Sequence, residues 1–304
     1  MKRIYQIFLI LFVLGWASVA HAKLNIVATT SDLSAIAREI GKDKVDVVSI
    51  AKPTEDPHFV DARPGHIVKL NKADMLIEGG LQLETGWLPN LITGARNPKI
   101  LAGSPGYLIA STGINVLEVP AALDRAMGDV HPFGNPHFML DPLNGKIVAT
   151  HICDRLCQID PINCSYYKEN LENFVKKLHQ KFAEWQKILE PFRGTKIVTY
   201  HKTFPYFANR FNLNVMGTLE PKPGIPPSPA HVNNLIPMMK SEGAKLILIE
   251  QFRERKIPEF VAAQTGAKVV IVPIMAGGTK ETGDYLSLFD YIINQITSAL
   301  EAKS

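Results

Sequence analysis

Short apolar runs alternate with helix-like repeats in both halves of the chain. After a strand-like run at 24–28, apolar positions recur every three or four residues up to Gly41, which is the period of an amphipathic helix. The same alternation of strand-like and helix-like segments occurs in the second half, which ends in an amphipathic helix at 285–300. This alternation predicts the α/β class with largely parallel sheets. The runs predicted as strands are 24–28, 45–50, 75–78, 196–200, 245–250 and 269–273.

One segment between the two halves keeps a helical period over a much greater length. Pro161 can start this helix and Pro191 can end it. About thirty helical residues would extend roughly 45 Å, which suits a rigid connection between two lobes. A coiled-coil partner is the alternative, but bulky aromatic side chains favour packing against the chain's own lobes. The apolar positions are Leu171, Phe174, Leu178, Phe182, Trp185 and Leu189.

These patterns predict two similar α/β lobes joined by one long helix. We expect the N-terminal lobe at 23–158, the connecting helix at 159–192 and the C-terminal lobe at 193–304. A chain of 304 residues is long enough for two such units.

The first 22 residues have the composition of a signal peptide. Positive charges at Lys2 and Arg3 precede an apolar run at 7–14, and the segment 20–22 fits a cleavage site between small residues. A membrane anchor is the alternative, but the unbroken run is shorter than the ~20 residues that span a bilayer. No Cys lies near the cleavage site, so a lipid anchor is not expected. The predicted location is the periplasm, after cleavage of the signal peptide.

Composition narrows the chemistry further. The net charge of +4 comes from 33 Lys+Arg against 29 Asp+Glu without a basic cluster, which argues against a nucleic-acid binder. With 9 His and only 3 Cys, a bound metal would be held mainly by imidazole and carboxylate groups. Cys157 and Cys164 flank a turn-like segment and are predicted to form a disulfide, which leaves Cys153 buried. A thiolate metal site is the alternative interpretation.

Three histidines follow predicted strands in loops rich in proline, aspartate or aromatic residues. They are His58 in Glu-Asp-Pro-His, His137 in Asn-Pro-His-Phe-Met-Leu-Asp-Pro, and His201 in Tyr-His-Lys-Thr-Phe. Ligands of open α/β sheets bind at the carboxyl ends of strands, so these loops can converge. Neutral imidazole is the commonest metal ligand among side chains.

These strings, in this order, resemble the metal-binding motifs of the zinc/manganese substrate-binding proteins of ABC transporters. The resemblance extends over the chain from about Leu24 to the C-terminus. It implies two α/β lobes joined by a long helix, with the metal between them. It makes His58, His137 and His201 metal ligands, and a third histidine is similar to the zinc-type members. Imidazole also suits zinc better than manganese.

The chain departs from this family where many members carry a fourth ligand. The stretch 272–278 contains no carboxylate, so zinc needs another fourth partner. Glu250 is the first candidate, either as a ligand or as a residue that orients one; Asp284, Glu281 and water are the alternatives. His131 is either an accessory metal-capturing residue or a solvated loop residue, and the second interpretation is favoured.

The resulting hypothesis is a monomeric, non-enzymatic protein that captures a divalent metal, zinc rather than manganese, and delivers it to an integral-membrane ABC permease. Two alternatives remain. One is a zinc hydrolase in which three histidines hold a metal-bound water and Glu250 acts as general base. The other is a metallochaperone or metal-dependent adhesin.

Overall fold

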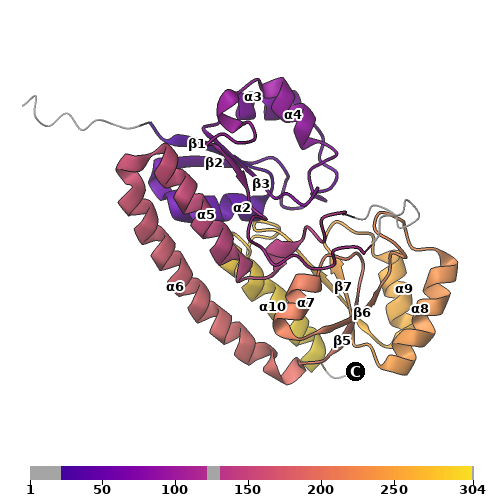
Figure 1. Cartoon of the computed structure of the whole chain (residues 1–304). Coiled ribbons are helices and arrows are strands. Elements are labelled where there is room, and N and C mark those ends of the chain that lie inside the picture. Colours follow the sequence, from indigo (N-terminus) through magenta and orange to yellow (C-terminus); the bar gives the residue numbers. More distant parts are fainter. Residues whose placement is uncertain (1–21, 122–130, 303–304) are drawn as a thin grey trace, which may run out of the picture.

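Two parallel β-sheets of the same topology form the framework of the molecule (Figure 1). The computed structural model describes residues 22–121 and 131–302. In the first sheet the strand order is β2-β1-β3-β4, and in the second it is β6-β5-β7-β8, so the two lobes share one arrangement. The strands are β1 (Leu24–Ala28), β2 (Val45–Ser49), β3 (Met75–Glu78), β4 (Tyr107–Ile109), β5 (Lys196–Thr199), β6 (Asn214–Thr218), β7 (Leu246–Glu250) and β8 (Lys268–Val272).

Helices cover both faces of each sheet. In the N-terminal lobe, α3 (Pro64–Asn71) and α4 (Leu88–Ala95) lie on the outer face, while α2 (Ser31–Gly41) and α5 (Asn144–Ile159) lie on the inner one (Figure 1). The C-terminal lobe has α8 and α9 outside and α7 and α10 inside. Their bounds are Pro205–Phe211 for α7, Pro229–Glu242 for α8, Lys256–Thr265 for α9 and Tyr285–Glu301 for α10.

A single apolar core extends through the inner side of both lobes. Because side chains alternate along a strand, Ile26 of β1 faces this core and Val27 faces the outer helices. Leu248 of β7 joins the same inner core from the other lobe, and Ile249 faces the outer helices there. One apolar core therefore joins the two lobes.

The predicted strands all lie where the sequence placed them, to within one residue at each end. Two strands were not predicted. β4 has only three residues, and β6 contains a glycine and polar side chains, so neither has a distinct apolar run. Both are edge strands, which bury less side-chain surface than central ones.

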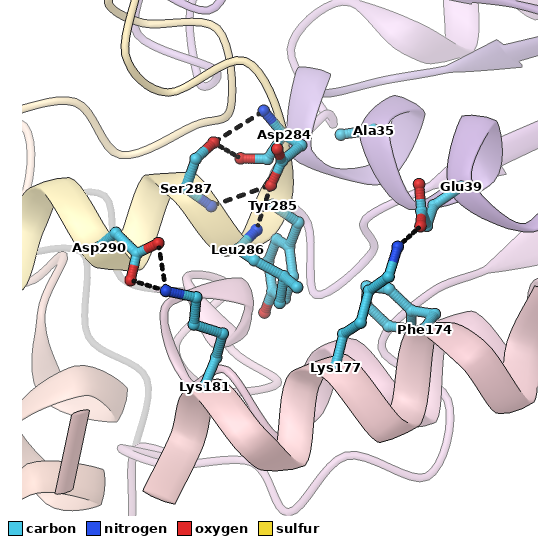
Figure 2. Close-up of a pocket in the computed structure, with 10 residues that line it drawn as sticks. All are labelled: Ala35, Glu39, Phe174, Lys177, Lys181, Asp284, Tyr285, Leu286, Ser287 and Asp290. Carbon is cyan, nitrogen blue, oxygen red and sulfur yellow. Dashed lines mark hydrogen bonds and ion pairs between the residues drawn. The ribbon is translucent and has the colours of Figure 1, made fainter. Parts of the chain in front are cut away.

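The long helix α6 (Cys164–Leu189) packs against both lobes. Its 26 residues span about 39 Å, and short 3-10 turns at Pro161–Asn163 and Glu190–Phe192 flank it. Figure 2 shows Lys177 of α6 paired with Glu39 of α2 (3.4 Å) and Lys181 paired with Asp290 of α10 (3.2 Å). We call this part of the molecule, where α2, α5, α6 and α10 meet, the helical side.

The corner between α5 and α6 contains the predicted disulfide. Cys157 and Cys164 are bonded, with their Cα atoms 4.4 Å apart, and Cys153 is free and buried. This pairing confirms the prediction. The signal-peptide prediction falls almost entirely on residues 1–21, outside the described part of the chain. Among the residues that are described, no helix has the length and apolar character needed to cross a membrane.

Candidate metal centre

The three predicted histidines converge where the lobes face each other. His58 lies in the loop after β2, His201 follows β5, and His137 directly precedes a short 3-10 turn at Phe138–Leu140. One ligand atom from each of the three lies within 4.8 Å of the other two. Their ring centroids are 5.1 to 5.6 Å apart. We call this region, formed by loops at the carboxyl ends of the strands, the loop edge.

Asp56 orients His58. Its Oδ1 lies 2.8 Å from Nδ1 of His58 and also accepts the backbone N–H of that residue at 3.0 Å. Trp87 donates its indole N–H to the carbonyl of Pro57 at 3.0 Å, which fixes the same loop from the α4 side. Because Nδ1 of His58 faces a carboxylate, Nε2 is the nitrogen left to bind a metal.

Glu220 has the same role for His201. Its Oε2 lies 2.7 Å from Nδ1 of His201, and only 4% of Glu220 and 6% of His201 is exposed. Glu220 follows β6, next to β5 in the sheet, so two neighbouring strand ends place this pair. A carboxylate behind an imidazole fixes its tautomer and increases its basicity, as in many metal sites.

His137 differs from the other two because no described carboxylate contacts its ring and its Nε2 is buried without a hydrogen-bond partner. Burial, followed by the nearby charges of His58 and His201, lowers the pKa of His137 well below its ordinary value, so the ring is neutral at pH 7. A buried polar atom without a partner is costly unless a ligand satisfies it. This nitrogen is therefore suited to a metal ion.

Asn135 fixes the backbone before His137. Its side-chain oxygen accepts the His137 backbone N–H at 2.9 Å, and its amide donates to the carbonyl of Lys202 at 2.7 Å. Tyr206 of α7 donates its hydroxyl to the Asn135 carbonyl at 2.8 Å. The loop that carries His137 is thus attached to the C-terminal lobe, beside His201.

Arg253 joins the carboxylates of both lobes. Its guanidinium lies 3.4 Å from Asp56, 3.4 Å from Glu220 and 3.6 Å from Glu250. The same group stacks over the ring of Tyr200, 5.3 Å from its centroid. Burial alone would raise the pKa of Asp56, but hydrogen bonds from His58 and the charge of Arg253 outweigh it and lower that pKa. Asp56 is therefore ionised at neutral pH.

Glu250 lies outside the group of three ligand atoms. Its side chain is fully buried, accepts a short hydrogen bond from the Thr203 hydroxyl and faces Arg253. Burial raises its pKa. Its other oxygen, Oε2, is buried without a hydrogen-bond partner among the described residues and lies 3.6 Å from Arg253. The alternatives Asp284 and Glu281 are not in the group either: Asp284 caps α10 through the N–H groups of residues 286 and 287, and Glu281 is exposed.

His131 is not the solvated loop residue that the sequence favoured. Its Nε2 lies 3.1 Å from Nε2 of His58, and its side chain is partly buried. Burial, followed by the charges of His58 and His201, lowers the pKa of His131 to about 4. A neutral imidazole therefore lies at the margin of the site.

Four groups of this centre were not recognised as such from the sequence: Asp56, Glu220, Arg253 and Asn135. Glu220 follows β6, and because that strand was not predicted, Glu220 was not seen as a strand-end residue. Asn135 belongs to the motif around His137, and Arg253 lies three residues after β7. For these two residues, position in the sequence was the signal that could have pointed to the metal centre.

Comparisons with known proteins agree with this geometry. The family model described as zinc-uptake complex component A, periplasmic (ZnuA), matches residues 26–299. A crystal structure of ZnuA superimposes with a TM-score of 0.76 at 25% identity, covering 91% of this chain and 98% of that one. A zinc-bound deletion mutant of ZnuA gives a TM-score of 0.77 at 25% identity, with 93% and 100% covered.

The curated relatives are named for several metals. A metal ABC transporter substrate-binding lipoprotein of Lactococcus lactis is 29% identical over 93% of this chain and 90% of its own length. A manganese-named lipoprotein of Streptococcus anginosus is 25% identical (91% and 89% covered). An iron-named one of Streptococcus pyogenes is 26% identical (94% and 92%). These relatives are extracytoplasmic transport proteins rather than enzymes. The chain belongs to the ZnuA family of metal-binding proteins of ABC transporters.

Proposed function

We propose that the protein captures Zn²⁺ outside the cytoplasm and delivers it to an ABC permease, with His58, His137 and His201 as ligands. The observation that carries this proposal is the convergence of three imidazole nitrogens within 4.8 Å. The buried, unpartnered Nε2 of His137 adds to it, because a metal ion would remove that penalty.

The charges around the site suit a divalent cation. Asp56 and Glu220 place carboxyl groups directly behind two of the imidazoles, close to the metal position. Arg253 lies on the far side of these carboxylates and faces Glu250 as well. Binding of a doubly charged ion would therefore compensate the two carboxylates without leaving a large net charge in a buried place.

The donor atoms favour zinc over manganese. Imidazole nitrogen suits zinc, whereas manganese is usually bound by carboxylate and other oxygen ligands. Relatives named for manganese and iron share the fold, so metal choice depends on the donor set rather than on the architecture.

A hydrolase would use the same metal differently, and Glu250 does not support that use. A general base needs access to a metal-bound water. Glu250 is fully buried and its carboxylate accepts from Thr203. Capture and release of the ion explain the site without a reaction.

Transport also requires export and a way to release the metal. We propose that residues 1–22 are a cleaved signal and that the lobes at 23–158 and 193–304 tilt slightly about the helix at 159–192. The shared inner core supports small movements only, because its side chains pack continuously from one lobe to the other. A small tilt at the loop edge would be enough to separate His58 from His137 and His201, because the His137 loop is attached to the C-terminal lobe.

A competition titration tests the proposal. The purified mature protein, freed of metal, is titrated with Zn²⁺ and separately with Mn²⁺ in the presence of a chromophoric chelator at pH 7.5. We expect one equivalent of zinc bound with submicromolar affinity, and manganese bound at least roughly tenfold more weakly. Micromolar or weaker zinc binding would contradict capture, and equal affinity for manganese would contradict the assigned metal.

A further inference from the structure

A fourth imidazole borders the space between the three histidines. Nε2 of His131 is 3.1 Å from Nε2 of His58, and the two ring centroids are 5.2 Å apart. His131 also lines a cavity of about 50 Å³ together with His137 and His201. His131 therefore contacts His58 on one side and shares a small cavity with the other two histidines.

The close approach of the two Nε2 atoms limits what can lie between His58 and His131. Nδ1 of His58 faces the Asp56 carboxylate, so Nε2 is the nitrogen that His58 can offer to a metal. Two nitrogens 3.1 Å apart are then compatible with a hydrogen bond from His131 to His58, or with a cation bound by both. A metal that replaces this proton gains two nitrogen ligands at once.

The separation also fits the geometry of zinc. Zinc–nitrogen distances are about 2.0–2.1 Å, so two nitrogens of a tetrahedral site lie roughly 3.3 Å apart. The distance between His58 and His131 is close to that value. His131 is not in the group whose ligand atoms all lie within 4.8 Å, so its imidazole must move toward the other ligands when the ion binds.

The described carboxylate that lines this cavity, Glu118, is engaged elsewhere: it accepts from the Asn135 amide at 2.8 Å and pairs with Lys202 at 3.7 Å. The stretch 272–278 lacks a carboxylate, and Glu250 is engaged by Thr203 and Arg253. We infer that His131 is the fourth zinc ligand, which completes a site of four neutral imidazoles. This inference rests on the proposed function, because it assigns a ligand of the same site. A site with four nitrogen donors would discriminate strongly against manganese.

Cobalt substitution tests the inference directly, because Co²⁺ has visible absorption bands that report its coordination number and ligands. We would compare the wild type with His131→Ala, His131→Cys and the exposed control His179→Cys. His131→Cys is expected to add a sulfur-to-cobalt charge-transfer band in the near ultraviolet, which His179→Cys lacks. His131→Ala is expected to weaken zinc binding by roughly tenfold or more and to change the visible cobalt bands. Melting temperatures of the metal-free variants would establish that each one is folded.

The results separate the two claims. If His131→Ala keeps wild-type affinity and cobalt bands, and His131→Cys adds no thiolate band, the inference is overturned. The proposed three-histidine site survives that outcome as long as His137→Ala abolishes tight binding. If His137→Ala also binds zinc like the wild type, the site itself is wrong and the inference falls with it.

Discussion

The lobes meet on two sides that differ in chemistry. On the helical side, apolar residues of α2, α6 and α10 form one core, in which Trp185 is almost fully buried and donates to Asp290 at 2.7 Å. At the loop edge, histidines, carboxylates and Arg253 meet instead. Apolar packing is insensitive to metal and pH, whereas the polar cluster depends on both.

This difference indicates how binding and stability can be separated in one small protein. Metal binding changes charge at the loop edge, where Arg253 and Asn135 link the lobes. The helical side limits how far the lobes can move. Mutations on the two sides should therefore affect different measurements, and the following predictions test that separation.

The largest effect is expected from His137→Ala at the loop edge. Loss of a ligand whose nitrogen is buried should weaken zinc binding by roughly a hundredfold or more, while stability without metal changes little. Zinc should then no longer raise the melting temperature, because ligand stabilisation scales with the logarithm of concentration over Kd. Calorimetric melting with and without zinc measures both quantities, and His179→Ala on the surface of α6 is the matched control. A variant that still gains wild-type stabilisation from zinc would exclude His137 as a ligand.

Trp185→Ala should lower the stability of the protein and leave its zinc affinity nearly unchanged, which is the reverse of the result expected for His137→Ala. Removing this ring from the inner core should reduce the free energy of unfolding by about 3–5 kcal/mol. Zinc affinity of the folded protein should stay within a few fold of wild type, because Trp185 lies on the helical side. Urea unfolding and chelator competition provide the two values. Trp185→Phe, which keeps most of the volume, is the control, and a large loss of affinity in Trp185→Ala would mean that the sides are strongly coupled.

Arg253→Gln tests whether charge holds the loop edge together. Without the guanidinium, the carboxylates of Asp56, Glu220 and Glu250 face one another, which should cost about 2–3 kcal/mol in the metal-free protein. Zinc should recover part of that loss, so its stabilising effect should exceed that in the wild type. Unfolding with and without zinc checks this, with the exposed neighbour Arg255→Gln as control. Equal stabilisation by zinc in both variants would argue against charge compensation.

The smallest effect concerns a carboxyl group near the loop edge. Glu84 is buried and accepts from Thr29 and from the N–H groups of Gly79 and Gly80, and burial raises its pKa to about 7. Because the folded-state pKa is raised, the stability contribution is complete below the unfolded value and falls as pH rises through the folded value. Glu84→Gln should therefore reduce the loss of stability that occurs as the pH rises from 4.5, the ordinary pKa, to about 7. Unchanged pH dependence of unfolding in this variant would assign the loss to other groups.

The sequence was informative wherever a local rule applied. The strand and helix periods located six strands and the long helix, and Pro161 and Pro191 lie in the turns at its two ends. The motifs around His58, His137 and His201 identified the three residues that the fold brings together. For His58 and His201 the position after a strand agreed with these motifs, because parallel strands end at a common edge.

Other features depended on how the loops meet. Glu250 has the strand-end position of a ligand, yet Thr203 and Arg253 engage it. His131 looked like a solvated residue but lies against His58. Neither outcome is readable from the spacing of residues, because each depends on which side chains arrive from the other strands.

The sequence alone determined the class of fold, the disulfide and the three candidate ligands, because hydrophobic period, turn chemistry and strand-end position act over short stretches of chain. Only the tertiary structure decided that Asp56 and Glu220 orient two of the histidines, that Arg253 connects both lobes and that one core runs between them. Those contacts join loops far apart in sequence, and their distances are set by the packing of two sheets rather than by any local preference.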